Sequence, residues 1–505
     1  MEVHRNRTLE TNGRRHLPLP TGPYQNVGFR DIMIGFSRRT GFLVRLYYPA
    51  ADQSRDIRSQ SLYWPNWLPH ENYRQGYISL TGVKWSLFQK AIRWLTGDDC
   101  FIPAIPKAKP LPQRMIPIVF SHGDCSCRST YSSLALEFAS HGFIVAAVEH
   151  RDGTACCTFY AKETRMPLST STMNVNTPDG PLQYDEEEDE EGFDEIDDPN
   201  YVPPKALSNS AILPHIATEW IGHLPIKGGR YTLRNRQINR RVKECIRTLD
   251  LLEALEAGYD VQNLLDSLLD PSEFEGLIDI SKAIVMGHSY GAATAIMTCS
   301  AELRFRLGIC LDAWMYPIYK ENYDLVTQPI SFINSEKFQT DENLRAIKRV
   351  LETNPYSCTD SGNQSHPVAN GNGNTKTGDD ALTNTVDEGS TLPDTSENKQ
   401  VSKDCTSGDE QVDEPDSRCL QNRVATIKGT VHYNQTDIPF VMPWLIKALW
   451  GGNSRRNPFT ALDLTAALAM EFISKQLKLD ILSIEKKVFL DKQRKKIKLG
   501  IKDKL

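Results

Sequence analysis

The chain has 505 residues, of which 40% are hydrophobic and 24% are charged. This composition is ordinary for a soluble globular protein and excludes a collagen-like or wholly disordered chain. No run approaches the ~18 consecutive apolar residues that a membrane-spanning helix needs. The first thirty residues lack the apolar segment of a secretory signal, so we expect a cytoplasmic protein. The eleven cysteines include no C-x-x-C pair, and reduced thiols are expected.

The net charge of -6 comes from one segment of the chain. Residues 185–198 hold eleven acidic side chains and no basic one, and without them the balance is +5. Residues 485–505 are basic, with nine Lys or Arg against three acids. Such a tail suits an anionic surface and equally suits a solvated helix end. We expect no nucleic-acid partner.

Two stretches interrupt the globular pattern. One is acidic and rich in proline, and the other is rich in Asn, Gly, Ser and Thr and has few residues with which to build a core. We expect both to be disordered loops inserted into a single domain, because loop closure entropy grows slowly with length. We expect a flexible N-terminus at 1–21, one domain at 22–480 and a basic tail at 481–505. The acidic insertion is expected at 162–205 and the second insertion at 353–422.

The rest of the chain alternates short apolar segments with segments of helical periodicity. Strands are predicted at 115–121, 143–148, 282–286, 307–311, 329–334 and 424–428. Helices are predicted at 130–140, 235–255 and 291–303. This alternation predicts an α/β fold with a mostly parallel sheet covered by helices on both faces.

Residues 287–291 read Gly-His-Ser-Tyr-Gly, a G-x-S-x-G pattern between an apolar strand and a helical segment. In this pattern a tight strand-to-helix turn exposes the serine hydroxyl above the sheet, with the helix N-terminus behind it. The two glycines allow the close backbone approach that the turn needs. Ser289 is therefore the candidate nucleophile. The alternative is a tight turn without chemistry.

A serine hydroxyl becomes an effective nucleophile when a histidine takes its proton and a carboxylate orients that histidine. For a G-x-S-x-G serine, the acid and then the histidine follow along the chain. Asp312 directly follows the apolar segment LGICL. Two histidines lie farther on, and His366 falls within the second insertion, which leaves His432 as the candidate base. The alternative for His432 is an ordinary loop histidine.

Catalysis on a carbonyl also needs two backbone N–H groups aimed at the developing negative charge. The amide of Tyr290, directly after the candidate nucleophile, is one candidate donor. The other is the amide of Asp124, in the His-Gly-Asp loop that follows the first predicted strand. The alternative is that this sequence is a plain loop.

Six strings stand in the order typical of one enzyme family: FSHG, YSSLALEFASHGFIVAAVEHRD, VMGHSYGAATAI, LDAWMYP, FINSEKFQT and GTVH. Together they resemble the platelet-activating-factor acetylhydrolases, serine-dependent phospholipid esterases of plasma and cytosol. The likeness covers roughly residues 22–160, 215–352 and 423–480. It implies an α/β-hydrolase fold and calcium-independent hydrolysis of an sn-2 acetyl or short, oxidised acyl ester of a glycerophospholipid. It implies no metal or cofactor, and the family's nucleophile, acid and base fall on Ser289, Asp312 and His432.

One position departs from the family's pattern. Members usually have Leu-Gly after the His-Gly of the oxyanion loop, where this chain has Asp124 and Cys125. Because only the backbone amide is needed, the donor survives the change, but a carboxylate aimed inward would repel the oxyanion. We expect the side chain of Asp124 to point away.

Tryptophan is concentrated in two segments that also carry aliphatic and basic residues, a mixture that suits a helix at a lipid headgroup boundary. The resemblance places lipid-facing helices at corresponding positions. The interface candidates are Trp85, Leu87, Phe88, Trp94, Trp444, Leu445 and Trp450. The expected partner is a phospholipid at a membrane or lipoprotein surface. The alternative is that both segments pack on the core as ordinary amphipathic helices.

The leading hypothesis is thus a serine esterase that hydrolyses the sn-2 ester of short-acyl phospholipids. Two alternatives stay open at this point. One is a carboxylesterase of the same fold without phospholipid preference, and the other is a non-catalytic scaffold in which Asp124 has spoiled the oxyanion hole. The sequence indicates neither the acyl-chain limit nor the oligomeric state.

Overall fold

The computed structural model describes residues 8–80, 100–163, 216–225, 230–354, 423–442 and 454–501. The chain divides into two units, residues 1–358 with 420–505 and residues 359–419, and all described residues belong to the first. Within these ranges no helix is long and apolar enough to cross a lipid bilayer.

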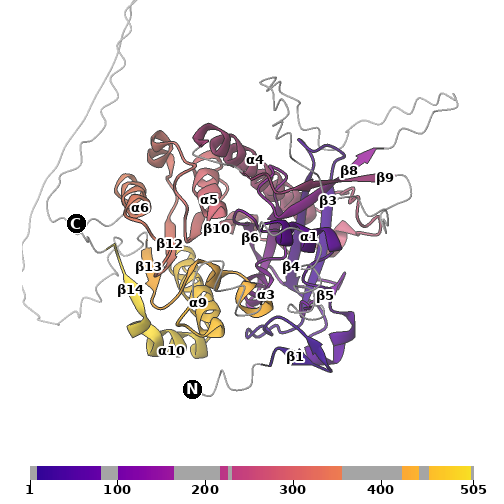
Figure 1. The fold of residues 1–505 in the computed structure, drawn as a ribbon. Coiled ribbons are helices and arrows are strands. Elements are labelled where there is room, and N and C mark those ends of the chain that lie inside the picture. Colours follow the sequence, from indigo (N-terminus) through magenta and orange to yellow (C-terminus); the bar gives the residue numbers. More distant parts are fainter. Residues whose placement is uncertain are drawn as a thin grey trace, which may run out of the picture. The chain divides into compact units, whose positions relative to one another are not determined.

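A ten-stranded sheet forms the centre of this unit, in the order β14-β13-β12-β11-β10-β6-β7-β4-β3-β5 (Figure 1). Its strands are β3 Val27–Ile34, β4 Phe42–Pro49, β5 Ile105–Pro106, β6 Ile116–Ser121, β7 Phe143–Glu149, β10 Ile284–His288, β11 Leu307–Leu311, β12 Ile330–Ser335, β13 Arg423–Ile427 and β14 Ile497–Leu499. The run from β7 through β6, β10, β11 and β12 to β13 is parallel. Antiparallel partners flank it, β4 beside β7 and β14 beside β13. The predicted mostly parallel sheet is confirmed.

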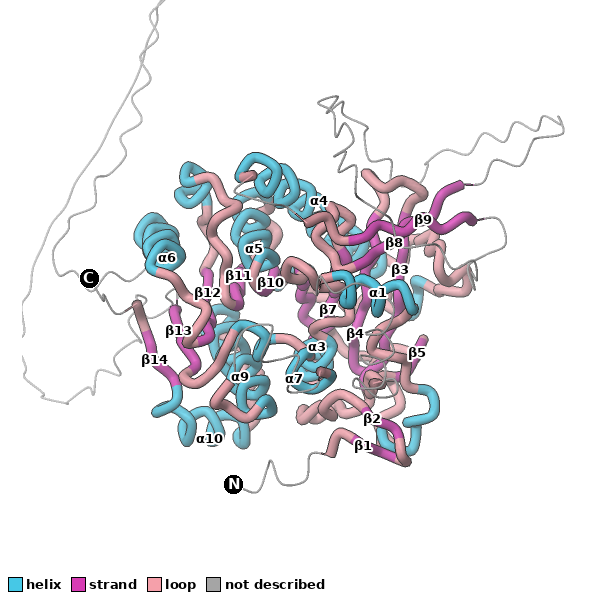
Figure 2. The backbone as a smooth tube through the Cα atoms, viewed as in Figure 1, coloured by secondary structure: helices cyan, strands magenta, loops and turns pink. Residues whose placement is uncertain are grey.

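Helices cover both faces of the sheet (Figure 2). They are α1 Glu71–Ser79, α3 Ser132–Ala139, α4 Tyr231–Glu256, α5 Tyr290–Ala301, α6 Asp341–Thr353, α7 Ile438–Val441, α9 Pro458–Leu477 and α10 Ile484–Gln493. Short 3-10 turns are η1 Ile57–Tyr63, η2 Pro271–Glu273, η3 Ile280–Lys282, η4 Lys320–Leu325, η6 His432–Gln435 and η7 Arg494–Lys496. Within β6, Ile118 and Phe120 join a core with α3 and α9, whereas Val119 joins a core with α4 and α5. Because both faces of the strand are covered, β6 is apolar from Ile116 to Phe120.

All the predicted strands and helices occur, with ends shifted by a few residues. A hairpin of β8 (Cys157–Glu163) and β9 (Ile216–Gly222) was not predicted, and it carries the chain one residue past Lys162, where the first insertion was expected to begin. The rest of both expected insertions lies outside the described residues, apart from Thr353, which ends α6, and the buried Asn354 after it.

The two ends of the domain are more ordered than the sequence indicated. In the N-terminal stretch expected to be flexible, β1 (Glu10–Thr11) pairs with β2 (Arg14–Arg15), and Leu17 is fully buried. Burial of the apolar Leu17 side chain is favourable, and it holds the neighbouring part of the N-terminal stretch against the core.

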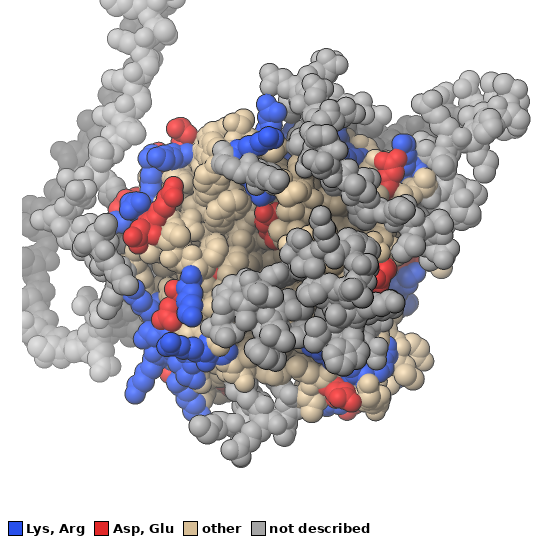
Figure 3. All heavy atoms as spheres, viewed as in Figure 1, with Lys and Arg blue, Asp and Glu red and all other residues tan. Residues whose placement is uncertain are grey.

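The expected basic tail forms α10 and β14, and Lys486 of α10 makes a buried ion pair of 2.6 Å with Glu137 of α3. Other Lys and Arg side chains gather over this part of the chain (Figure 3).

Candidate active site

Ser289 lies at the turn between β10 and α5, with φ 58° and ψ −116°. A non-glycine residue in this region of φ is strained, and it persists only where the surroundings enforce it. Here the turn is enforced by close backbone contacts. A Cβ on Gly287 would lie 2.0 Å from the carbonyl oxygen of Gly291, and a Cβ on Gly291 would lie 2.0 Å from that of Ser121. Only glycine fits at both positions.

Asp312 follows β11, the strand beside β10, and its side chain is fully buried. Its carboxylate accepts hydrogen bonds from the backbone N–H of Ser335 at 2.6 Å and from the Ser335 hydroxyl at 2.5 Å. It also accepts one from Nδ1 of His432, with 3.0 Å between Nδ1 and Oδ2. Ser335 ends β12, the next strand of the sheet, so three neighbouring strand ends build this part of the site.

His432 begins the turn η6, after β13, and its side chain is one third exposed. The ring of Phe338 stacks on it, with 3.8 Å between centroids and 13° between planes. On another side the ring of His288 lies 4.3 Å away. Because His288 precedes Ser289, this contact places the imidazole beside the nucleophile turn. With Nδ1 bound to the Asp312 carboxylate, Nε2 is the nitrogen left for a reacting group.

The backbone of the loop after β6 runs directly over the nucleophile turn. A Cβ on Gly123 would lie 3.2 Å from the Cβ of Ser289. The N–H of Gly123 donates to the hydroxyl of Tyr131 at 3.0 Å, whereas no hydrogen bond within the described residues uses the N–H of Asp124. Tyr290 is the first residue of α5, where a helix leaves its N–H groups without an intrahelical acceptor. Within the part of the chain that the structure describes, neither the N–H of Asp124 nor that of Tyr290 donates a hydrogen bond.

The carboxylate of Asp124 is held by two basic side chains. Oδ1 lies 3.2 Å from Nε2 of His223, and Oδ2 accepts a hydrogen bond of 2.9 Å from Arg234. Burial acts to raise the pKa of Asp124, but the hydrogen bond with His223 and the charge of Arg234 outweigh burial and lower it. The carboxylate is thus ionised at neutral pH, with its charge directed at these partners.

Buried ion pairs also hold the loop that follows β6. Arg241 of α4 is fully buried, donates to the carbonyl oxygen of His122 at 2.7 Å and pairs with Asp152 at 2.9 Å. Arg128 pairs with Glu149 at 2.5 Å and with Asp31 at 3.2 Å, and its side chain is 3% exposed. Buried charges of this kind are costly to leave unpaired, so the loop backbone is held in one position.

A family model described as "Platelet-activating factor acetylhydrolase, isoform II" matches residues 9–488. The chain belongs to this family. It is 34% identical to the platelet-activating factor acetylhydrolase of Bos taurus over 340 residues, which is 67% of this chain and 64% of that protein. The match thus spans somewhat less than two thirds of the bovine protein. The Gallus gallus protein of the same name is 33% identical over 360 residues, covering 70% and 74% of the two chains.

More distant proteins match over longer stretches. A putative phospholipase A2 of Schizosaccharomyces pombe is 23% identical over 451 residues, covering 85% of this chain and 82% of that protein. A solved ferulic acid esterase of Streptomyces cinnamoneus superposes with a TM-score of 0.48 at 14% identity, covering 95% of this chain and 97% of that one. The family membership does not rest on these two proteins.

Asp437, which the sequence did not single out, ties the histidine segment to the start of α3 in this family member. Its buried carboxylate accepts from Nε1 of Trp67 at 3.0 Å and from the backbone N–H groups of Ser132 and Ser133 at 2.8 and 3.0 Å. Its own N–H donates to the carbonyl oxygen of Thr130 at 2.8 Å. Burial raises the pKa of Asp437 to about 7. The carboxylate therefore caps α3 and joins two distant segments of the site.

The predicted lipid-interface residues of this acetylhydrolase-family chain all lie outside the described residues: Trp85, Leu87, Phe88, Trp94, Trp444, Leu445 and Trp450. Of the neighbouring tryptophans, Trp64 and Trp67 are buried at 3% and 5% exposure. These two therefore belong to the core.

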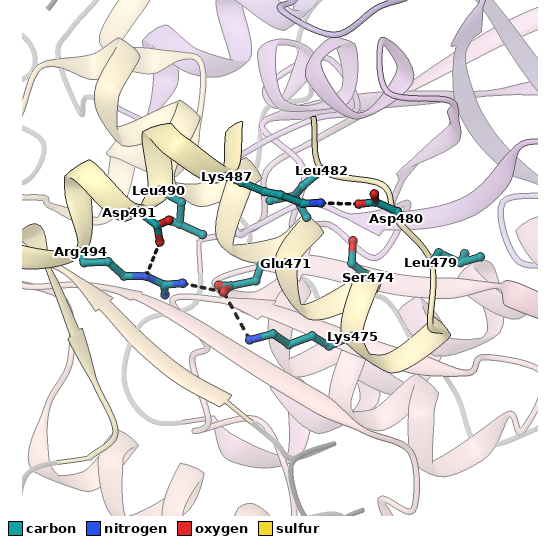
Figure 4. Close-up of a pocket in the computed structure, with 10 residues that line it drawn as sticks. All are labelled: Glu471, Ser474, Lys475, Leu479, Asp480, Leu482, Lys487, Leu490, Asp491 and Arg494. Atoms are coloured by element: carbon teal, nitrogen blue, oxygen red, sulfur yellow. Dashed lines mark hydrogen bonds and ion pairs between the residues drawn. The ribbon is translucent and has the colours of Figure 1, made fainter. Parts of the chain in front are cut away.

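A crevice of about 440 Å³ lies between α9 and α10 (Figure 4). None of the predicted site residues lines it. Its charged side chains pair with one another: Arg494 bonds Glu471 at 2.7 Å, and Lys487 bonds Asp480 at 2.6 Å. These charged side chains are therefore paired within the crevice itself, and the crevice gives no indication of a reaction.

Replacing Asp437 with alanine tests the link between the two segments. Asp437→Ala leaves three buried N–H donors without an acceptor, and we expect the free energy of unfolding to fall by about 3 kcal/mol. Denaturant unfolding measures this change. Asp480→Ala is the matched control, since Asp480 pairs at the surface, and its effect should stay within about 0.5 kcal/mol. Equal effects of the two variants would contradict the proposed role.

Proposed function

We propose that this chain is a serine esterase that hydrolyses the sn-2 acetyl or short acyl ester of glycerophospholipids. The observation that carries the proposal is the 3.0 Å hydrogen bond between His432 Nδ1 and the buried Asp312 carboxylate, beside the strained Ser289 turn. A histidine held in this way is oriented to act as a general base. The substrate class is inferred from the relatives named platelet-activating factor acetylhydrolase.

In the first half of the proposed reaction, Ser289 Oγ attacks the ester carbonyl carbon while His432 Nε2 takes the hydroxyl proton. Asp312 keeps the imidazole in the tautomer with its proton on Nδ1 and stabilises the imidazolium that forms. The negative charge on the former carbonyl oxygen is received by the N–H groups of Tyr290 and Asp124. The intermediate collapses, and the departing lysophospholipid oxygen takes the proton from the imidazolium.

In the second half, water attacks the acyl-serine ester. His432 removes a proton from that water, and the same two amides stabilise the second oxyanion. Collapse returns the proton to Ser289 and releases the short carboxylic acid. Carbonyl polarisation comes from backbone N–H groups and nucleophile activation from a histidine, so the proposed steps require no calcium.

Ser289→Ala removes the attacking oxygen. Turnover of an acetyl-phospholipid should fall at least ~10³-fold, because residual rate would come only from substrate binding and the oxyanion site. Steady-state release of acetate measures the loss, and an unchanged unfolding midpoint shows that the variant is folded. A variant that keeps most of its activity would remove the serine mechanism.

A chain-length series tests the substrate class. We expect kcat/KM to be highest for acetyl and other short sn-2 chains, to fall for long chains and to be lower for a simple soluble acetyl ester. A pocket that admitted long chains would gain about 0.8 kcal/mol for each buried methylene group. Values that rise with chain length would contradict the short-acyl preference. Equal values for the soluble ester would favour a carboxylesterase without phospholipid preference.

A further inference from the structure

Three metal-ligand side chains converge at the side of the oxyanion loop: Asp124, Cys125 and His223. Nε2 of His223 lies 3.3 Å from Sγ of Cys125 and 3.2 Å from Oδ1 of Asp124. One ligand atom from each residue lies within 4.8 Å of the other two. No residue spacing signals this group in the sequence, because His223 is 98 positions from Cys125.

The separations agree with ligands around one small cation. Zinc binds thiolate sulfur at about 2.3 Å and imidazole nitrogen or carboxylate oxygen at about 2.0–2.2 Å, usually with tetrahedral angles. Two ligand atoms of such a site are then about 3.3–3.6 Å apart. The observed 3.3 and 3.2 Å fall close to these values. A set of one sulfur, one nitrogen and one oxygen ligand also favours zinc over calcium or magnesium.

The backbone on both sides of the group is anchored. Cys125 has φ 62°, and its N–H donates to the carbonyl oxygen of Thr154 at 2.8 Å. Directly after His223, the N–H of Leu224 donates to the carbonyl oxygen of Gly153 at 2.8 Å. Residues 153–154 therefore hold both arms of the group, which keeps its geometry with little loss of entropy on binding.

Arg234 orients the carboxylate from outside the group. It bonds Oδ2 of Asp124 at 2.9 Å, while Oδ1 faces His223. Partners of this kind commonly orient metal ligands. The guanidinium charge opposes a bound cation, whereas the carboxylate and the thiolate together supply two negative charges that match a divalent ion.

We propose that Asp124, Cys125 and His223 bind one thiophilic divalent cation, with Zn²⁺ the best match and water at the fourth position. On binding, the Cys125 thiol releases its proton to solvent and sulfur bonds the metal, with no change in oxidation state. His223 binds through the Nε2 lone pair, with its proton on Nδ1. The ion would sit beside the loop that carries one proposed oxyanion donor.

Co²⁺ is the probe for this site, because a cobalt–thiolate bond gives a charge-transfer absorption band. Titrating the full chain should give such a band that saturates at one equivalent. Cys125→Ser should abolish the band, and His223→Gln should weaken Co²⁺ binding at least ~10-fold. Cys100→Ser is the matched control and should leave the band intact, since Cys100 and Cys125 are the partly exposed cysteines among those described.

A measurement without mutation covers the case in which a variant does not fold. Zn²⁺ should protect Cys125, but not Cys100, from alkylation by iodoacetamide, read out by peptide mass spectrometry. Absence of both the band and the protection would overturn the proposal. So would Co²⁺ binding that survives Cys125→Ser and is lost in His432→Gln, because His288, Asp312 and His432 form the other possible ligand group among the described residues.

Discussion

The hydrogen bond between His432 and Asp312 joins a fully buried carboxylate to a partly exposed imidazole ring. The rest of the site depends on this difference in exposure. A carboxylate without solvent must find its hydrogen bonds within the protein, and Ser335 supplies two of them. Nδ1 of His432 and Nε2 of Gln339 donate to the same carboxylate at 3.0 and 3.5 Å, and the first of these bonds orients the imidazole. The parallel sheet brings these groups together, because β11 and β12 end side by side at the edge of the sheet where the Ser289 turn lies.

The oxyanion loop depends on a second set of buried charges, and this set explains how the chain tolerates a carboxylate at position 124. His223 and Arg234 engage that carboxylate, while Arg241 of α4 donates to the carbonyl oxygen of His122 in the same loop. The side chain of Asp124 therefore has its own partners, whereas its backbone N–H donates no hydrogen bond within the described residues. Asp124, which departs from the family's pattern, keeps its amide apart from its side-chain contacts, and its carboxylate belongs to the three side chains that we propose to bind a cation.

The sequence predicted the central strands well because parallel strands covered on both faces are short apolar runs, as in β10 and β11. It missed β8, β9 and β14, which owe their pairing to distant partners and not to a local apolar run. It also missed β3 and β4, a neighbouring antiparallel pair whose apolar runs are interrupted by Arg30 and Arg45. Chain order singled out Ser289, Asp312 and His432 as candidates, and the structure brings Asp312 and His432 within 3.0 Å of each other. Chain order carries no information on Asp437 or Phe338, because their contacts with the site join segments far apart in the sequence.

The proposed mechanism depends most directly on Ser289 being the activated nucleophile. Brief exposure of the full chain to a fluorophosphonate, followed by peptide mass spectrometry, identifies the modified side chain. The proposed mechanism predicts a single adduct, on Ser289. In His432→Gln the adduct should form far more slowly, because the serine then lacks its base. An unmodified Ser289, or an equal rate of modification in His432→Gln, would contradict it.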